Sequence, residues 1–179
     1  MKAALYFDVG SPYVYLSASR LALDDVEWKP ISLGGLFKLT GRSSWGLSDG
    51  REAGMAEIEA RAARYGLPPV RWPEPWPGHY LGAMRACLVA DEGGVLTDFA
   101  RTALQMGFVE GRDLSLVGEV LEAAARVRLD PEYVFERITA PEIKLRLIAE
   151  TAAAHARGVF GVPTLAVGER LLWGDDQLG

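Results

Sequence analysis

The sequence predicts an α/β fold in which one small β-sheet carries a large inserted block of helices. Strand-like alternation occurs only near the two ends of the chain, whereas helical spacing fills most of the residues between them. Two strands at each end are too few to stand as separate sheets. We therefore expect both ends to join in one four-stranded sheet, with the helices inserted between them.

The chain opens with a β-α-β pattern. Residues 5–16 are LYFDVGSPYVYL, in which an alternating apolar segment is followed by a Gly-Ser-Pro turn and a new helical pattern. Residues 26–32, VEWKPIS, alternate like a second strand. The two strands of such a unit are expected to lie parallel.

From residue 33 the spacing becomes helical. Apolar residues predict helices around residues 55–65, 81–88, 96–104 and 117–124, a short helix opened by Asp130-Pro131, and a long one from Pro141 to Arg157-Gly158. Residues 68–77 hold five prolines and two tryptophans, which predicts a rigid, extended loop. The strand pattern then returns at 162–167 and 170–173 as a hairpin, with a final helix barely begun at Asp175.

Composition limits the classes of partner. The 179 residues include 19 Lys and Arg against 24 Asp and Glu, a net charge of −5, so no nucleic-acid partner is expected. No apolar run approaches the roughly 20 residues of a membrane span. The single cysteine, Cys87, excludes an intrachain disulfide and is expected to pack in the core of a cytoplasmic protein. No metal site is predicted.

Ser11 is the first candidate for a functional side chain. It stands where the first helix begins, among backbone N–H groups that have no partner within the helix and at the positive end of the helix dipole. This environment favours an anion such as a thiolate or phosphate. Taken alone, Ser11 followed by Pro12 is more typical of an ordinary N-cap and first helical residue.

Four segments carry a resemblance to a known family. They are FDVGSPYVYL at the start, LGGLFKLTG at 33–41, ARYGLP at 63–68 and GVFGVPTLAVGERLLWGDDQL at 158–178. Together they resemble the 2-hydroxychromene-2-carboxylate isomerase and kappa-class glutathione transferase family of the thioredoxin superfamily. The resemblance covers essentially the whole chain. It implies a thioredoxin-like domain formed by residues 1–33 and 150–179, a helical domain at 34–149, and a homodimer.

The resemblance also implies the origin of the reactive sulfur. Redox members of the superfamily carry Cys-x-x-Cys at the turn, where this chain has Ser11-Pro12-Tyr13-Val14. Dithiol chemistry is thereby excluded at this turn. In the family that the chain resembles, the sulfur belongs to the cofactor glutathione, and Ser11 would donate its hydroxyl to the glutathione thiolate. That hydrogen bond and the helix start would both lower the pKa of the thiol.

The rest of the glutathione site is expected near the C-terminus. The proline of Val162-Pro163 is cis in the superfamily, which leaves the preceding backbone N–H and C=O able to pair with a bound cysteinyl peptide. An ordinary trans bond is the alternative. The segment Trp173-Gly174-Asp175-Asp176 would complete the site, with the carboxylates receiving the α-ammonium of the γ-glutamyl group. The same carboxylates also suit a simple helix cap.

The second-substrate end departs from the family pattern. The family has Asn after the Lys-x-x-Gly turn, where this chain has Arg42, and another Asn on or near His79. We expect Lys38 and Arg42 to bind a carboxylate opposite an aromatic wall of the proline-rich loop, with Trp76 and His79 lining the pocket. Arg42 as a solvated turn residue and His79 as a helix cap are the alternatives.

The resemblance implies a glutathione-dependent isomerase. Thiolate would add reversibly to an aromatic carboxylate substrate, the ring would open and rotate, and elimination would return glutathione. A kappa-type glutathione transferase and a non-catalytic module that binds thiols or peptides are the alternatives. The family continues past residue 178 into another helix, so we expect an open sheet face unless another element or subunit covers it.

Overall fold

The fold is described by a computed structural model covering residues 2–23 and 25–178. Met1, Asp24 and Gly179, which belong to the predicted thioredoxin-like domain, lie outside the described residues. Within them the two ends of the chain do join in one four-stranded sheet of order β2-β1-β3-β4. The strands are β1 (Ala4–Phe7), β2 (Glu27–Pro30), β3 (Thr164–Val167) and β4 (Arg170–Trp173). This confirms the predicted strands.

The sheet is mixed. Strand β1 pairs in parallel with β2, as predicted for a β-α-β unit, and antiparallel with β3, which continues into β4 through the predicted hairpin. All of β1 is buried, because it lies in the centre of the sheet. The ring of Phe7 packs edge-on against Trp28 of the neighbouring strand, with ring centroids 5.2 Å apart.

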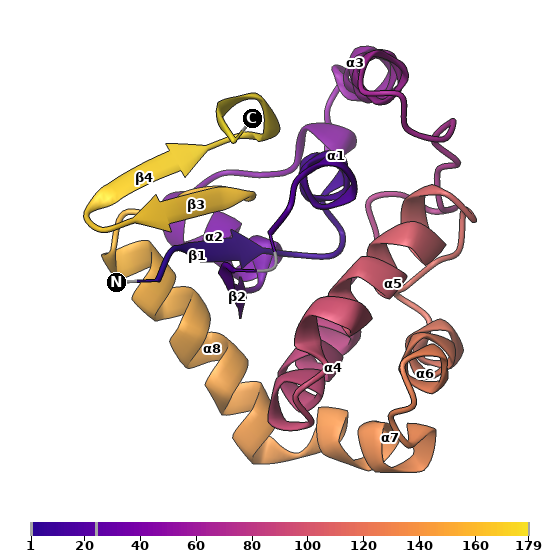
Figure 1. Ribbon diagram of the computed structural model, residues 1–179, viewed down its shortest axis with the longest axis vertical. Helices are drawn as coiled ribbons and strands as arrows, with labels where there is room; N and C mark the ends of the chain where they lie inside the picture. Colours follow the sequence, from indigo (N-terminus) through magenta and orange to yellow (C-terminus); the bar gives the residue numbers. More distant parts are fainter. Residues whose placement is uncertain (1, 24, 179) are drawn as a thin grey trace.

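The described part of the chain contains eight helices. Seven lie where the sequence predicts a helix, and the eighth, at 33–40, lies where it predicts only that helical spacing begins. Figure 1 shows α4 to α7 gathered on one side of the molecule and α8 returning from them to the sheet. The helices are α1 (Pro12–Arg20), α2 (Leu33–Thr40), α3 (Arg51–Arg64), α4 (Leu81–Glu92), α5 (Leu96–Phe108), α6 (Val117–Arg126), α7 (Pro131–Thr139) and α8 (Pro141–Ala156). Two 3-10 turns, η1 (Trp45–Leu47) and η2 (Asp175–Gln177), complete the described structure.

Local chemistry accounts for the helix ends. The Asp130 carboxylate accepts the N–H of Glu132 at 3.0 Å and caps α7, whose first residue is Pro131. Helix α8 ends before Gly158, whose φ of 99° lies in the region that favours glycine. The predicted domain boundary between residues 149 and 150 falls inside the continuous helix α8. The division into two domains stays a prediction.

The core extends from the sheet into the helical block. Helices α4 and α5 are buried along most of their lengths, and Cys87 is fully buried in α4, which confirms its packing role. Burial raises the pKa of the Cys87 thiol well above its ordinary value. Over the described ranges, no helix combines the length and the apolar character that crossing a membrane requires.

A buried hydroxyl ties α2 to α8. The backbone N–H of Ser32, the N-cap of α2, donates to Thr151 Oγ1 at 2.9 Å, and that hydroxyl donates to the carbonyl of Leu147 at 2.8 Å. Thr151 is only 4% exposed, so water does not readily replace it. The contact therefore fixes the start of α2 against the helix that leads into β3.

We expect Thr151→Val to lower the free energy of unfolding by about 1–3 kcal/mol, because the isosteric change leaves the Ser32 N–H buried without an acceptor. Urea unfolding followed by circular dichroism measures the change. Thr139→Val is the matched control, since the Thr139 hydroxyl is exposed and donates only to Glu136 of its own helix. Equal midpoints for the two variants would contradict the role of Thr151.

Candidate active site

The candidate site lies on the side of the sheet where β1 and β4 end and β3 begins. Tyr6 pairs with Thr164, so the antiparallel register continues to place Pro163 beside Phe7. The N–H of Gly174 donates to the carbonyl of Pro163 at 3.0 Å. The Val162–Pro163 bond is cis, as the resemblance implies. The turn before α1, the cis-proline and the end of β4 therefore meet.

Ser11 occupies the N-cap of α1. Its Oγ accepts the N–H of Val14 at 3.4 Å, and its own N–H donates to the carbonyl of Asp8 at 3.1 Å. This confirms the N-cap interpretation. The residue is 2% exposed, and its hydroxyl hydrogen is donated to no other described residue. The cap uses the hydroxyl as an acceptor only, so the donor remains available for an anion.

The backbone of Val162, like the hydroxyl of Ser11, has hydrogen-bonding capacity that the described residues do not use. The residue is 5% exposed and precedes the cis bond. No hydrogen bond between described residues uses its N–H or C=O, whereas the carbonyls on both sides, of Gly161 and Pro163, accept from Thr164 Oγ1 and the N–H of Gly174. A donor and an acceptor are thus left for an extended peptide.

Asp8 lies beneath the Ser11 turn and ties it to a second helix. One carboxylate oxygen accepts the N–H of Gly10 and the other the N–H of Leu33, the first residue of α2, both at 2.8 Å. Asp8 is 5% exposed, and this burial raises its pKa from 3.8 to about 6 against the opposing effect of the two N–H donors.

The proline-rich loop packs onto the turn. Trp76 is 5% exposed, and its indole N–H donates to the carbonyl of Gly10 at 3.3 Å. A Cβ on Gly10 would lie 2.2 Å from the ring of Tyr80, so only glycine fits there. Trp76 therefore supports the turn from inside and presents little surface to a substrate, contrary to the expected pocket wall.

The two other loop residues, Trp72 and His79, differ in their contacts. The indole N–H of Trp72 donates to the Glu59 carboxylate at 2.8 Å, and its ring lies 4.7 Å from that of Trp76. His79 is exposed. The N-cap of α4 is Tyr80 and has no side-chain cap, so the helix-cap interpretation of His79 is wrong. Among the described residues, no hydrogen bond, ion pair or ring contact joins Lys38 or Arg42 to this loop.

Arg42 instead contacts the segment before the cis-proline. Its Nη1 donates to the carbonyl of Phe160 at 2.7 Å, and its guanidinium carbon lies 5.5 Å from the centre of the Phe160 ring. That ring in turn packs on Trp173, with centroids 4.8 Å apart. Lys38 is exposed on α2. Two predicted site residues from distant segments, Arg42 and Trp173, are thus brought together through Phe160.

Asp175 and Asp176 have different environments. Asp175 is fully buried, with one carboxylate oxygen 2.7 Å from Nη1 of Arg61 and the other accepting the Tyr65 hydroxyl at 3.0 Å. Arg20 donates to its backbone carbonyl. Asp175 therefore ties the segment after β4 to α3 and α1, and its complete burial keeps a ligand ammonium from reaching it. Asp176 is exposed and available.

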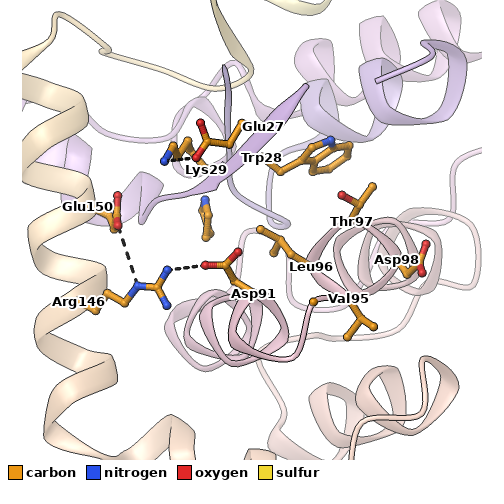
Figure 2. A pocket seen from close by; sticks show the side chains of 12 residues that line it. Glu27, Trp28, Lys29, Asp91, Val95, Leu96, Thr97, Asp98, Arg146 and Glu150 are labelled. Carbon is orange, nitrogen blue, oxygen red and sulfur yellow. Dashed lines mark hydrogen bonds and ion pairs between the residues drawn. The ribbon is translucent and has the colours of Figure 1, made fainter. Parts of the chain in front are cut away.

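A pocket of about 270 Å³ lies elsewhere, between the outer edge of β2, the α4–α5 connection and α8 (Figure 2). Its charged residues are largely paired with one another: Lys29 lies 2.5 Å from Glu27, and Arg146 lies 2.5 Å from Asp91. None of its lining residues belongs to the predicted site.

The strand order, the cis-proline and the capped turn define a thioredoxin-fold protein whose turn lacks the redox cysteines. Residues 4–179 match the family model of the DSBA-like thioredoxin domain, and the chain belongs to that family. It is similar to the 2-hydroxychromene-2-carboxylate isomerase of Sphingobium xenophagum, 26% identical over 188 residues that cover 97% of this chain and 92% of that protein. The stated resemblance is therefore confirmed.

Solved structures support the same fold. A 2-hydroxychromene-2-carboxylate isomerase superposes with a TM-score of 0.87 at 22% identity, covering 99% of this chain and 91% of that one. A probable DsbA oxidoreductase from Streptomyces coelicolor has a TM-score of 0.75 at 20% identity, covering 98% and 84%. A cytosolic disulfide reductase from Pseudomonas aeruginosa, solved with GSH, has a TM-score of 0.68 at 16% identity, covering 96% and 88%.

Sequence reasoning missed three contributors to the site. Asp8 precedes a glycine-containing turn at a strand end, where a carboxylate that accepts backbone N–H groups is common, and this signal was available. Phe160 and Tyr80 carry no such signal. Their roles depend on contacts with Arg42 and Gly10, which lie far away in the chain.

The raised pKa of Asp8 predicts a pH-dependent stability. Between about pH 4 and 6 the unfolded chain releases the Asp8 proton while the native protein keeps it, so this residue lowers the free energy of unfolding as the pH rises. The total effect is about 3 kcal/mol at roughly 1.36 kcal/mol per pKa unit.

We expect Asp8→Asn to remove this component, so that the difference in unfolding free energy between variant and wild type changes by about that amount from pH 4 to 7. Urea titrations across this range provide the measurement. The asparagine side chain accepts only one of the two N–H groups, which lowers the free energy of unfolding by the same amount at every pH. The slope of the free energy against pH is therefore unaffected by this loss. Asp49→Asn, at an exposed position, is the control. Parallel profiles for Asp8→Asn and wild type would refute the assignment.

Proposed function

We propose that this protein is a glutathione-dependent isomerase of the 2-hydroxychromene-2-carboxylate type. The observation that carries the proposal is the Ser11 hydroxyl, held at the start of α1 next to the cis Val162–Pro163 bond with its hydrogen uncommitted. The similarity to an isomerase of that name over nearly the whole chain supports the reaction type.

The protein's thiol chemistry has to use a sulfur from outside. Cys87 is the single cysteine of the sequence and is fully buried in α4, so it can supply neither a dithiol nor an accessible nucleophile. A neighbour of the same fold was solved with GSH, which supports a thiol peptide as the ligand of this end of the sheet. When bound, glutathione would supply the nucleophilic sulfur.

The residues of this chain would then act by binding and electrostatics. Ser11 donates its hydroxyl hydrogen toward the thiolate, and the N-terminus of α1 stabilises the same negative charge. The backbone of Val162 pairs with the cysteinyl backbone, and Asp176 receives the γ-glutamyl ammonium. Lys38 and Arg42, the exposed cations of α2 and the turn after it, hold the carboxylate of the aromatic substrate.

We expect Ser11→Ala to raise the thiol pKa of bound glutathione by about 1–2 units, because a hydrogen bond to a charged group contributes about 1.5–3 kcal/mol. Ultraviolet titration of the thiolate in the complex measures this pKa. The activity at neutral pH should fall in proportion to the lost thiolate.

Ser32→Ala is the matched control for this experiment. Ser32 caps α2 as Ser11 caps α1, with its Oγ accepting the N–H of Gly35 at 3.0 Å. Both variants lose a helix cap, which costs about 1 kcal/mol of stability. A thiol pKa that is unchanged in Ser11→Ala, or raised equally in Ser32→Ala, would rule out the proposed role of the Ser11 hydroxyl.

We also propose a homodimer, as the resemblance implies. Leu145 and Ile148 are each 65% exposed on α8 and give this helix an apolar outer face that a second copy can cover. Sedimentation at micromolar concentration should show a dimer, and Leu145→Glu with Ile148→Glu should give a folded monomer. Phe135→Glu, at an exposed residue of α7, should remain dimeric. A monomeric wild type would contradict the proposal.

A further inference from the structure

The aromatic wall of the second substrate has to be sought outside the proline-rich loop. Trp76 is 5% exposed and donates to Gly10, and Trp72 is packed on Trp76 and donates to Glu59. Trp76 thereby holds the loop on the Ser11 turn, and Trp72 holds it on α3 and on Trp76. A flat ligand that stacks next to the site needs rings that are open to solvent.

Phe160 and Trp173 supply such rings. They are 43% and 46% exposed, and they pack on each other with centroids 4.8 Å apart. Large apolar side chains left half-exposed as a pair are typical of a binding surface. No described residue accepts the indole N–H of Trp173, in contrast to those of Trp72 and Trp76.

The ring pair borders the proposed thiol-binding segment. Phe160 precedes Val162 by two residues, and Trp173 precedes Gly174, whose N–H donates to Pro163. The indole also lies across the intervening backbone, because a Cβ on Gly161 would be 2.4 Å from Trp173 Nε1. A ligand on these rings would therefore lie next to the peptide that Val162 holds.

Arg42 places a positive charge next to the ring pair. Its guanidinium donates to the Phe160 carbonyl through Nη1 and lies against the Phe160 ring, which holds it in place. No carboxylate among the described residues pairs with Arg42, whereas Arg61, Arg126 and Arg146 are all paired. The remaining N–H groups of an exposed guanidinium suit a carboxylate.

We propose that Phe160, Trp173 and Arg42 form the subsite for the second substrate, in which a planar aromatic ring stacks on the ring pair and its carboxylate is bound by Arg42. This inference rests on the proposed function for the identity of the thiol beside it. It assigns the aromatic wall to the end of the sheet and makes Phe160 a specificity-determining residue.

The test uses 2-naphthoate and 2-naphthamide, which share a flat bicyclic ring and differ in charge. Their affinities are measured by calorimetry with and without saturating glutathione, and the affinity for glutathione is measured separately. Phe160→Leu and Trp173→Leu should weaken both probes by about 3- to 10-fold, the size of an aromatic stacking contribution. Trp173→Phe keeps an aromatic ring and should retain most of the wild-type affinity for both probes.

Arg42→Gln should weaken 2-naphthoate by about tenfold, change 2-naphthamide less than twofold, and so remove the preference for the charged probe. Arg42→Lys should retain part of that preference. Phe135→Leu, at an aromatic residue of α7 that is 51% exposed, is the matched control and should change neither probe.

The outcomes separate the two proposals. Wild-type protein that binds no glutathione contradicts the proposed function, while the naphthoate affinities measured without glutathione still test the ring pair. The subsite is overturned if the leucine variants bind naphthoate as wild type does. It is also overturned if they lose glutathione affinity to the same extent, because the rings would then belong to the thiol site.

Discussion

The arrangement of the site depends on one buried carboxylate. Asp8 accepts the N–H of Gly10 with one oxygen and the N–H of Leu33 with the other, so it joins the turn before α1 to the start of α2. Burying a carboxylate costs free energy, and here two backbone N–H donors, one in the turn before α1 and one at the start of α2, offset part of that cost. The start of α2 is held a second time by Thr151 of α8. The strand ends, the capped turn and both helices are therefore fixed relative to one another before any ligand arrives.

The elements of the fold could be predicted because their signals are local. Alternation marked the strands, apolar spacing marked the helices, and punctuation such as Asp130-Pro131 and Gly158 marked their ends. The single sheet could be predicted because two strands at each end of the chain are too few to form separate sheets. The position of Ser11 at a helix start was equally local, because a Ser-Pro pair after a strand specifies an N-cap wherever the chain later packs.

The surroundings of the site could not be predicted in the same way. Asp175 was expected to face a ligand, yet Arg61, 114 residues earlier, brings its carboxylate into the interior. Trp76 was expected to line a pocket, and the Gly10 carbonyl is its partner instead. Both errors concern polar atoms that found a partner from a distant segment. A rule based on composition or spacing contains no information about a partner that lies so far away in the chain.

The outer strand β2 shows how the sheet avoids extension by other chains. The N–H groups of Glu27 and Ile31 donate to the carbonyls of Ala3 and Phe7, so the backbone groups of the alternate residues Trp28 and Pro30 point to the outer edge of the sheet. Proline has no N–H, which leaves the Trp28 N–H as the edge donor of the strand. A foreign strand that aligned with β2 would therefore find one N–H donor among residues 27–30. The edge of the mixed sheet at β2 thus offers few backbone donors to a foreign strand, and α4 and α8 lie beside it.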